Sequence, residues 1–435
     1  MYCYYSLAGL NYKNGFVTCC PRQADHLFYQ KEEFLPSKII NSRNFLNLRK
    51  KLLNDEWPSG CDTCEEMENS SLKSMRQDFI LENDNRFYNN KSAELQLSEY
   101  ANSTILQNLN TDYSMNYDGI RHVELRFSNL CNFSCLHCSD VYSSKWEHII
   151  KNYGKTKLDH QFELSQLLGK EHRKYDDEDL KIDLSVEQVE LIVDDLCKNF
   201  KNIERIDFSG GEPLYQKQFW KALEKIQEHP NLKKMYCCFH TNLNSDFDIE
   251  CLVDLLNGFM GCSIIISVDG SSKIYEYFRK GGKWNNLISN IDKLKIAKQR
   301  FQKKITCTTS AYQLLDIQNI FNDFLDIDLQ IETSIVQSPK YINPSILKYD
   351  LYDELICDFE MTKNMIENHK NVKMKEVALR NLISIENYFK SINLGYRYYN
   401  SFLAYVKRMD EIHQMDFNKH YMRYQYLDGE IIKNE

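Results

Sequence analysis

The feature that most constrains this chain is a group of three closely spaced cysteines, Cys131, Cys135 and Cys138, in the pattern C-x3-C-x2-C. They directly follow a strand expected over residues 123–128. A cubane iron–sulfur cluster bound only by protein uses four cysteines, and the next one, Cys197, lies far along the chain in an expected helix. The spacing therefore predicts a [4Fe–4S] cluster with one iron open to another ligand. A zinc knuckle or free thiols are the alternatives.

Length and composition limit the number of domains, the cellular compartment and the partners that are expected for this chain. The chain has 435 residues, which suggests two or three domains. It contains no apolar run of about 18 residues, so no membrane span is expected. Fifteen cysteines, without a secretory signal pattern, indicate a reducing cytoplasmic compartment where thiols bind metals or pack. A net charge of −8 without a dense basic block argues against a nucleic-acid-binding surface.

The triplet and the residues leading into it, Leu125 to Asn132, resemble the cluster loop of the radical S-adenosylmethionine (SAM) enzymes. In that family the open iron binds the amino and carboxylate groups of SAM. Reduction then splits SAM into methionine and a 5′-deoxyadenosyl radical, which abstracts a hydrogen atom from the substrate. The resemblance covers about residues 119–340, where six β/α units are counted. It implies an α/β fold with a partial (β/α)6 barrel, related to the TIM barrel.

Polar residues alternate with apolar ones in several of the expected barrel strands. The six strands are expected at residues 123–128, 203–209, 234–239, 262–268, 304–310 and 329–336. Helices cover the outer face of a barrel, so the polar side chains are expected to face the lumen. Glu124, Arg126, Asp207 and Glu332 are therefore the candidate catalytic residues that face a substrate. A network of ion pairs without substrate contact is the alternative.

Further motifs follow the later strands in the order that the resemblance requires. Gly210-Gly211-Glu212 ends the second strand, where glycines permit close backbone approach and the carboxylate can meet an ammonium group. In the family this motif contacts the amino group of SAM. The other candidate SAM-binding residues are His137, Thr241, Asn242, Ser267, Asp269, Arg279 and Ser310. Ser267 and Asp269 match the ribose position, and Arg279 would hold the SAM carboxylate. An exposed arginine that caps a helix is the alternative for Arg279.

Residues 1–75 carry a second group of cysteines: Cys3, Cys19, Cys20, Cys61 and Cys64. Asn14-Gly15 predicts a hairpin between strands at 10–12 and 16–18, and a helix is expected over 42–53. The arrangement resembles the twitch module, the short form of the SPASM domain, which binds one auxiliary iron–sulfur cluster. The family spacing from a glycine, here Gly15, favours Cys20 over Cys19 as a ligand. A structural zinc site is the alternative.

Three other segments complete the expected organisation. Residues 76–118 form a polar connector with a helix expected over 93–108, and residues 341–435 form a helical C-terminal region. Its aromatic side chains belong either to the core or to a binding platform. The charged insertion at 153–184 is either a lid or a solvated loop. Ser185 to Gln188 form a capping box that opens a helix.

Three functions are compatible with these patterns. The first is radical SAM modification of a peptide or protein, because twitch and SPASM enzymes commonly act on such substrates. The second is the same chemistry on a polar small molecule such as a sugar or nucleoside. Both need an electron donor, either a reductase or a flavodoxin or ferredoxin. The third is an iron–sulfur electron-transfer or binding protein that does not cleave SAM. The auxiliary cluster would either bind substrate or accept an electron.

Overall fold

The computed structural model describes residues 3–13, 16–21, 28–29, 33–69, 74–76, 106–140, 142–153, 157–158, 162–163, 183–296, 301–337, 339–427 and 430–433. The chain divides into two compact units. Unit 1 comprises Met1–Asn129, Asp177–Phe239 and Glu250–Cys262, and unit 2 comprises Leu130–Asp176, His240–Ile249 and Ser263–Glu435. Within the described ranges, no helix combines the length and apolar character that a membrane crossing needs.

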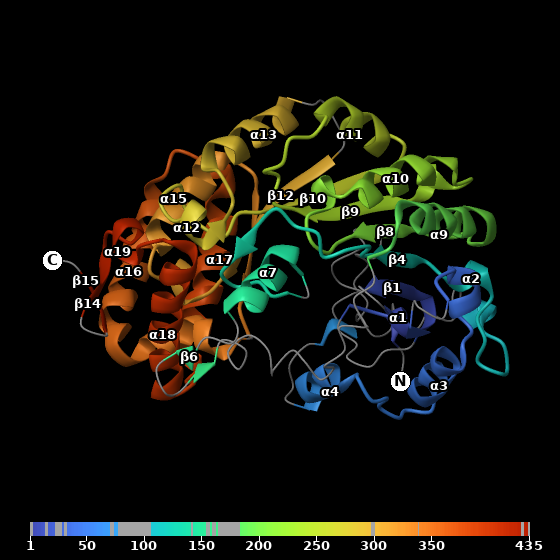
Figure 1. The fold of residues 1–435 in the computed structure, drawn as a ribbon, viewed down its shortest axis with the longest axis horizontal. Helices are drawn as coiled ribbons and strands as arrows, with labels where there is room; N and C mark the ends of the chain where they lie inside the picture. The colour runs from blue at the N-terminus through green and yellow to red at the C-terminus, as the bar shows by residue number, and fades with distance from the viewer. Residues whose placement is uncertain are drawn as a thin grey trace. The chain divides into compact units, whose positions relative to one another are not determined.

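Unit 1 is built on a sheet with the strand order β9-β8-β4-β1-β2-β3 (Figure 1). The strands are β1 Gly9–Lys13, β2 Phe16–Thr18, β3 Phe28–Tyr29, β4 His122–Leu125, β8 Arg205–Phe208 and β9 Tyr236–Thr241. The pairs β1–β4, β4–β8 and β8–β9 are parallel, and β1–β2 and β2–β3 are antiparallel. The predicted hairpin is confirmed in its two strands, which also extend the parallel sheet through β1. No local pattern in the sequence predicts the pairing of β1 with β4.

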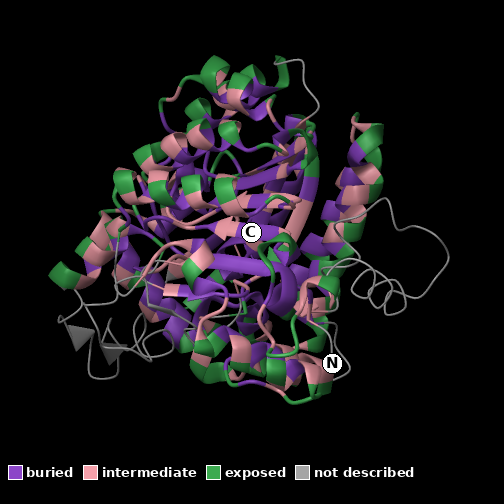
Figure 2. Ribbon diagram, turned by 90° about the vertical axis from the view of Figure 1, so that its right-hand side faces the viewer, coloured by how far each residue is buried: buried purple, intermediate pink, exposed green. Residues whose placement is uncertain are grey.

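The two faces of this sheet differ in polarity, as the alternation in β4 predicts. Leu10, Val123, Ile206 and Cys237 stand in register across four strands, and each is at most 1% exposed. The opposite face carries polar side chains at the next register position, such as Glu124 opposite Asp207. Figure 2 shows the strands largely buried, with exposed residues concentrated on the helices. Burying one apolar face is therefore what fixes the register.

Unit 1 contains seven α-helices among the described residues, and a predicted capping signal opens one of them. They are α1 Tyr4–Ala8, α2 Pro36–Ile39, α3 Arg43–Leu53, α4 Asp62–Asn69, α9 Val186–Asn199, α10 Lys217–Lys225 and α11 Ile249–Leu256. The capping box that opens α9 is confirmed: Gln188 N donates to Ser185 Oγ (3.2 Å) and Ser185 N donates to Gln188 Oε1 (2.9 Å). Together these bonds satisfy two backbone donors at the start of the helix.

Unit 2 contains the later part of the β/α alternation. Its sheet strands are β10 Gly261–Ser267, β12 Phe301–Thr309 and β13 Gln330–Ile335, and β12 and β13 pair in parallel. The helices that alternate with them are α13 Trp284–Ile296, α14 Ala311–Leu314 and α15 Ile317–Ile327. The strand order follows the chain in unit 2 (β10-β12-β13) and along the parallel strands β4-β8-β9 of unit 1. The protein is therefore a mixed α/β fold with a largely parallel sheet, consistent with a partial β/α barrel.

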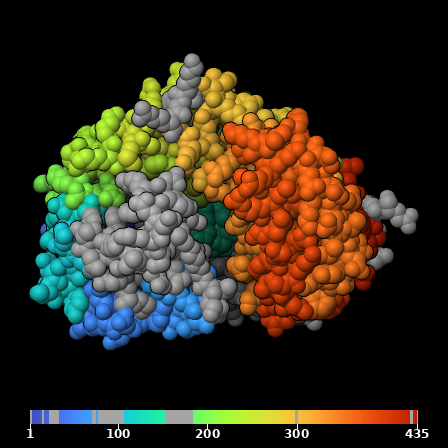
Figure 3. Space-filling model, turned by 180° about the vertical axis from the view of Figure 1, so that it is seen from behind, coloured from blue at the N-terminus to red at the C-terminus, as the bar shows by residue number. Residues whose placement is uncertain are grey.

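The C-terminal region is helical, as predicted, and ends in a hairpin that the sequence did not predict. Its elements are α16 Lys348–Asn368, α17 Val372–Ser391, α18 Tyr396–His413, α19 Phe417–His420, β14 Tyr424–Leu427 and β15 Glu430–Lys433. Figure 3 shows its residues, in orange and red, packed together. Tyr399, Phe402, Tyr405 and Tyr424 are each 0% exposed, so these aromatics form core. Asp358 joins helix and hairpin, because Tyr424 Oη (2.7 Å) and Lys433 Nζ (3.1 Å) donate to it.

Some expectations lie outside the described residues. These are the Asn14-Gly15 turn, residues 77–105 of the connector and residues 164–182 of the charged insertion. The strand expected over 123–128 ends at Leu125 (β4), although Arg126 N still donates to Tyr12 O (3.1 Å) and continues the ladder for one more bond. The domain boundaries proposed from the sequence remain predictions.

Candidate cluster and cofactor sites

The loop with Cys131, Cys135 and Cys138 lies in unit 2 and is held by hydrogen bonds along its backbone. Its short strand β5, Ser134–Cys135, pairs antiparallel with β11, Arg279–Lys280. The side chains that bond its carbonyl groups are Ser143 Oγ to Phe133 O (2.6 Å), Trp146 Nε1 to Cys135 O (2.9 Å) and Tyr405 Oη to Leu136 O (2.6 Å). Trp146 belongs to α7, Ser144–Tyr153, and Tyr405 to α18. The loop is thus fixed from several elements before any ligand binds.

The three thiols of this loop lie within electrostatic range of one another. Burial, then the neighbouring Cys135 and Cys131, raise the pKa of the Cys138 thiol well above its ordinary value. Iron binds thiolates, so cluster assembly would remove these protons. Three adjacent thiols on a fixed loop suit the three-cysteine site that the spacing predicts.

Arg279, Asp269 and His137 form a buried group in the same unit. Arg279 Nη1 and Asp269 Oδ2 form an ion pair whose side chains are 8% and 3% exposed. Thr308 N donates to Asp269 Oδ1 (2.7 Å), and His137 Nε2 lies 3.7 Å from Asp269 Oδ2. The His137 ring stacks on Phe278 with centroids 5.0 Å apart. Burial alone would lower the pKa of Arg279, but Cys135 and Asp269 outweigh it and raise that pKa.

This group fits the cofactor that the sequence pattern implies. Arg279 Nε and His137 Nδ1 are buried and have no hydrogen-bond partner among the described residues. A buried polar atom without a partner is costly, so a ligand carboxylate that accepts from Arg279 would remove that cost. The alternative of an exposed capping arginine is wrong, because Arg279 is only 6% exposed. Both Asp269 oxygens are already bonded within the protein, so Asp269 orients Arg279.

The other candidate SAM residues of unit 2 make mainly internal contacts. Asn242 Nδ2 donates to Asn132 Oδ1 (2.8 Å), which ties the Thr-Asn motif to the cluster loop. Thr241 Oγ1 accepts from Leu243 N (2.9 Å), and Leu243 takes a left-handed φ of 51°. Ser310 caps α14, where its Oγ accepts from Tyr312 N (3.2 Å). Ser267 is half-buried at the end of β10. SAM contact by these residues remains a prediction.

The Gly-Gly-Glu motif in unit 1 makes the tight turn that the sequence predicts. Gly210 and Gly211 have φ values of 84° and 53°, which favour glycine. A Cβ atom at Gly210 would lie 2.0 Å from Arg126 Cγ, so no side chain fits there. Glu212 is 1% exposed, and its carboxylate accepts from Leu214 N (3.1 Å).

The candidate catalytic residues all form ion pairs. Glu124 Oε1 lies 3.6 Å from Arg126 Nη2 and accepts a hydrogen bond from Ser209 Oγ (2.6 Å). Asp207 bonds to His122 Nε2 (2.9 Å) and Arg205 Nε (2.7 Å). Burial would raise the pKa of Asp207, but its interactions with His122 and Arg205 outweigh burial and lower the pKa to about 2. In unit 2, Glu332 is 42% exposed and pairs with Lys304 (2.6 Å). The ion-pair network exists, and substrate contact remains a prediction.

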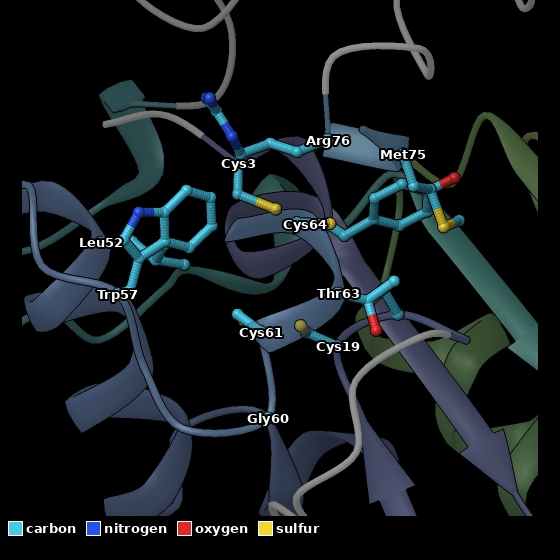
Figure 4. Close-up of a pocket in the computed structure, with 12 residues that line it drawn as sticks. Cys3, Cys19, Leu52, Trp57, Gly60, Cys61, Thr63, Cys64, Met75 and Arg76 are labelled. Atoms are coloured by element: carbon cyan, nitrogen blue, oxygen red, sulfur yellow. The ribbon is translucent and has the colours of Figure 1, made fainter. Parts of the chain in front are cut away.

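The five cysteines of residues 1–75 line one pocket in unit 1 (Figure 4). The pocket is lined by Cys3, Tyr5, Cys19, Cys20, Leu52, Trp57, Gly60, Cys61, Thr63, Cys64, Met75 and Arg76. In Figure 4 the sulfur atoms of Cys3 and Cys64 face each other. Burial and then Cys20 raise the pKa of Cys3 to about 12, and burial and then Cys3 raise that of Cys61. The fold thus gathers thiols that are up to 61 positions apart in the sequence.

The arrangement of these thiols differs from that of a simple ion site. Across the part of the chain that the structure describes, no group of three His, Cys, Asp or Glu side chains is placed to hold a metal ion. Thiolates that bind a multi-iron cluster attach to different irons, so they need not converge on one point. A sulfur-lined pocket of this kind fits a cluster in its donor chemistry.

Sequence reasoning missed several residues of both sites. Trp146 and Tyr405 bond the cluster loop, and Trp57 and Arg76 line the sulfur pocket. The Arg76 guanidinium lies 5.7 Å from the centre of the Trp57 ring and pairs with Glu68. Trp146 lies close to the triplet in the sequence, so it could have been considered as a partner of the cluster loop. Tyr405 lies 269 positions beyond Leu136, and no local pattern links the two.

Comparison with known proteins finds a family match for one segment of the chain. Residues 125–310 match the model of the Radical SAM superfamily, a segment that includes the cysteine triplet, the Gly-Gly-Glu turn and Arg279. This segment of the chain matches radical SAM superfamily enzymes. No curated protein matches it.

Among solved structures, 31 chains match. One is anSMEcpe with bound AdoMet, at 16% identity and a TM-score of 0.35, covering 58% of this chain and 68% of that one. Another is Streptococcus suis SuiB bound to precursor peptide SuiA, at 13% identity and a TM-score of 0.36, covering 78% of this chain and 66% of that one. At these scores neither likeness supports an argument about substrate or auxiliary clusters.

Proposed function

We propose that this enzyme uses radical SAM chemistry to abstract a hydrogen atom from a peptide or protein side chain. The observation that carries the proposal is the cluster loop: three thiols on a backbone fixed from β11, α7 and α18, with the buried Arg279 beside them. When bound, the cluster and SAM supply the radical that removes the hydrogen atom. A non-catalytic iron–sulfur protein, the third alternative, is disfavoured by the superfamily match.

The residues of this chain have separate roles in the proposal. Cys131, Cys135 and Cys138 hold the cluster, and Arg279 binds the SAM carboxylate while Asp269 orients it. Trp146 and Tyr405 keep the loop carbonyls bonded, so that the thiols keep their spacing when substrate arrives. Binding and orientation of this kind are what a protein contributes to cofactor chemistry.

The five-cysteine pocket is proposed to bind one auxiliary iron–sulfur cluster. Cys3, Cys20, Cys61 and Cys64 are its expected ligands, and Cys19 is the alternative to Cys20. Four cysteine ligands leave no open iron, which favours a role as an electron acceptor after hydrogen abstraction. Iron and sulfide counts near eight of each per chain would support two clusters, and counts near four would remove the auxiliary one.

A peptide is the preferred substrate because the cysteine arrangement of residues 1–75 resembles twitch modules, whose enzymes commonly act on peptides. A polar small molecule, such as a sugar or nucleoside, is the second candidate. The charged row that includes Glu124 and Asp207 favours it, because such side chains suit hydroxyl-rich ligands.

The experiment uses the reconstituted enzyme with SAM and dithionite under anaerobic conditions and measures 5′-deoxyadenosine. A substrate should raise its formation and donate deuterium to it when labelled. Stimulation by a short peptide encoded next to this gene supports the first proposal, and stimulation by sugars or nucleosides alone supports the second. The Cys135→Ala variant should abolish formation, whereas the exposed Cys357→Ala control should not.

A further inference from the structure

Arg49 is a fully buried arginine in α3 of unit 1, next to the sulfur pocket. It is 0% exposed and lies one turn before Leu52, which lines that pocket. Its guanidinium donates to Ser6 O (3.1 Å), Asn41 Oδ1 (3.2 Å) and Tyr113 O (3.4 Å) and lies 5.6 Å from the centre of the Phe45 ring. These contacts fix its position in the core.

None of these partners carries a negative charge. Within the described residues no carboxylate forms an ion pair with Arg49, and its Nη2 atom is buried without a hydrogen-bond partner. Burying a charged group without a partner is costly in folding free energy, so native proteins pair such charges. The structure therefore calls for an anion close to Arg49.

The ionisable group that acts on Arg49 is a cysteine of the pocket. Burial lowers the pKa of Arg49 to about 10, and Cys19 opposes that effect. Cys19 in turn interacts with Cys20, Cys3 and Cys61. The second arginine near the pocket, Arg76, is already balanced by Glu68. Arg49 is thus the arginine at this site whose charge no carboxylate balances among the described residues.

Arg49 also holds the segment that carries Cys3. Ser6 Oγ donates to Cys3 O (2.8 Å), and Arg49 Nε donates to Ser6 O. The helix α1 therefore links the guanidinium to the first cysteine of the pocket. Arg49 therefore influences the pocket both through its charge and through its hydrogen bond to the segment that carries Cys3.

We infer that Arg49 supplies the positive charge that balances an anionic metal–thiolate centre in the five-cysteine pocket. The inference rests on the proposed auxiliary centre. A buried cation favours thiolate over thiol, so it strengthens metal binding. It also favours gain of an electron by an iron–sulfur centre, so it raises the reduction potential of that centre.

The test uses the full-length chain with Cys131, Cys135 and Cys138 all replaced by Ala, so that only the pocket can be loaded with iron and sulfide. The variants added to this background are Arg49→Gln, which keeps amide donors but removes the charge, Arg49→Lys, which keeps the charge, and Lys50→Met. Lys50 is exposed on the same helix, so it is the matched control for loss of one charge. Reduction is followed by electron paramagnetic resonance at defined potentials.

At a fixed potential, Arg49→Gln should lower the ratio of reduced to oxidised centre on the order of tenfold, a shift of about 59 mV to lower potential for one electron. Arg49→Lys and Lys50→Met should titrate like the background. Equal potentials for Arg49→Gln and the background would overturn the inference. So would a Gln variant that is unfolded both with and without iron, because that result assigns Arg49 a purely structural role.

Whether the pocket binds an auxiliary cluster at all is determined separately, by measuring the metal content of the background chain. A background chain that binds no metal would overturn both proposals. A chain that binds zinc but no iron would overturn only the auxiliary iron–sulfur cluster. The variants are then compared by chelator competition, and Arg49→Gln should bind zinc about tenfold more weakly, with equal affinity contradicting the inference.

Discussion

The replacement Asp269→Asn tests the buried ion pair that orients Arg279 beside the cluster loop. Asn keeps an oxygen that can accept from Thr308 N but removes the negative charge. Since the two side chains are only 3% and 8% exposed, the variant leaves a buried guanidinium without its partner. Loss of one member of a buried pair costs about 3–5 kcal/mol. For a unit of this size, that lowers the melting temperature by about 6–20 °C.

The assay is thermal unfolding of the iron-free protein, in which no cluster adds its own charge. Lys283→Met is the control, because Lys283 pairs with Glu276 at 2.7 Å but is 66% exposed, and exposed pairs contribute about 0–1 kcal/mol. The double variant Asp269→Asn, Arg279→Met should lose much less stability than the sum of its single changes. If Asp269→Asn loses no more stability than the control, Arg279 does not depend on Asp269 for its charge balance.

Three further outcomes follow from other contacts. Tyr405→Phe leaves Leu136 O unpaired in the core and should lower the free energy of unfolding by about 1–3 kcal/mol in a denaturant titration. Tyr396→Phe is the control and should lower it little, because Tyr396 is 49% exposed. Equal losses would contradict the role of Tyr405. Gly210 and Gly395 both have a positive φ (84° and 89°), so replacement by Ala strains the backbone at either site. Only at Gly210 would the new Cβ meet Arg126, so Gly210→Ala should be less stable than Gly395→Ala by about 1–3 kcal/mol. Equal stability of the two variants would refute the close contact. Burial, and then Lys280, lower the pKa of His413 to about 4. As pH falls, the unfolded chain therefore binds this proton first, and stability is lost from about pH 6.5 towards pH 4. His413→Gln should lessen that loss, and an unchanged dependence of stability on pH would contradict this role of His413.

Local patterns in the sequence predict much of this fold. The capping box at Ser185 opens α9, the apolar spacing of residues 42–53 gives α3, and alternation in β4 sets which face of the sheet is buried. Each of these signals acts over a few residues, so the sequence displays it directly. The cysteine triplet likewise lies within eight positions.

The remaining features depend on partners that are distant in the sequence. The parallel pairing of Leu10 with Val123 extends the sheet through the cysteine-rich segment, and it has no local signature. The bond from Tyr405 to Leu136 spans 269 positions. Asp269 was expected to contact ribose, yet its oxygens bond Arg279 and Thr308. Motif position identifies these residues as important, but only packing decides which atoms they meet.

One measurement decides whether SAM binds the cluster held by Cys131, Cys135 and Cys138. The chain with the five pocket cysteines replaced by Ala is reconstituted and reduced, and its electron paramagnetic resonance spectrum is recorded before and after SAM is added. We expect one cluster per chain whose spectrum changes with SAM, and no such cluster when Cys135→Ala is added. A cluster whose spectrum is unchanged by SAM, or one that persists without Cys135, would contradict this expectation.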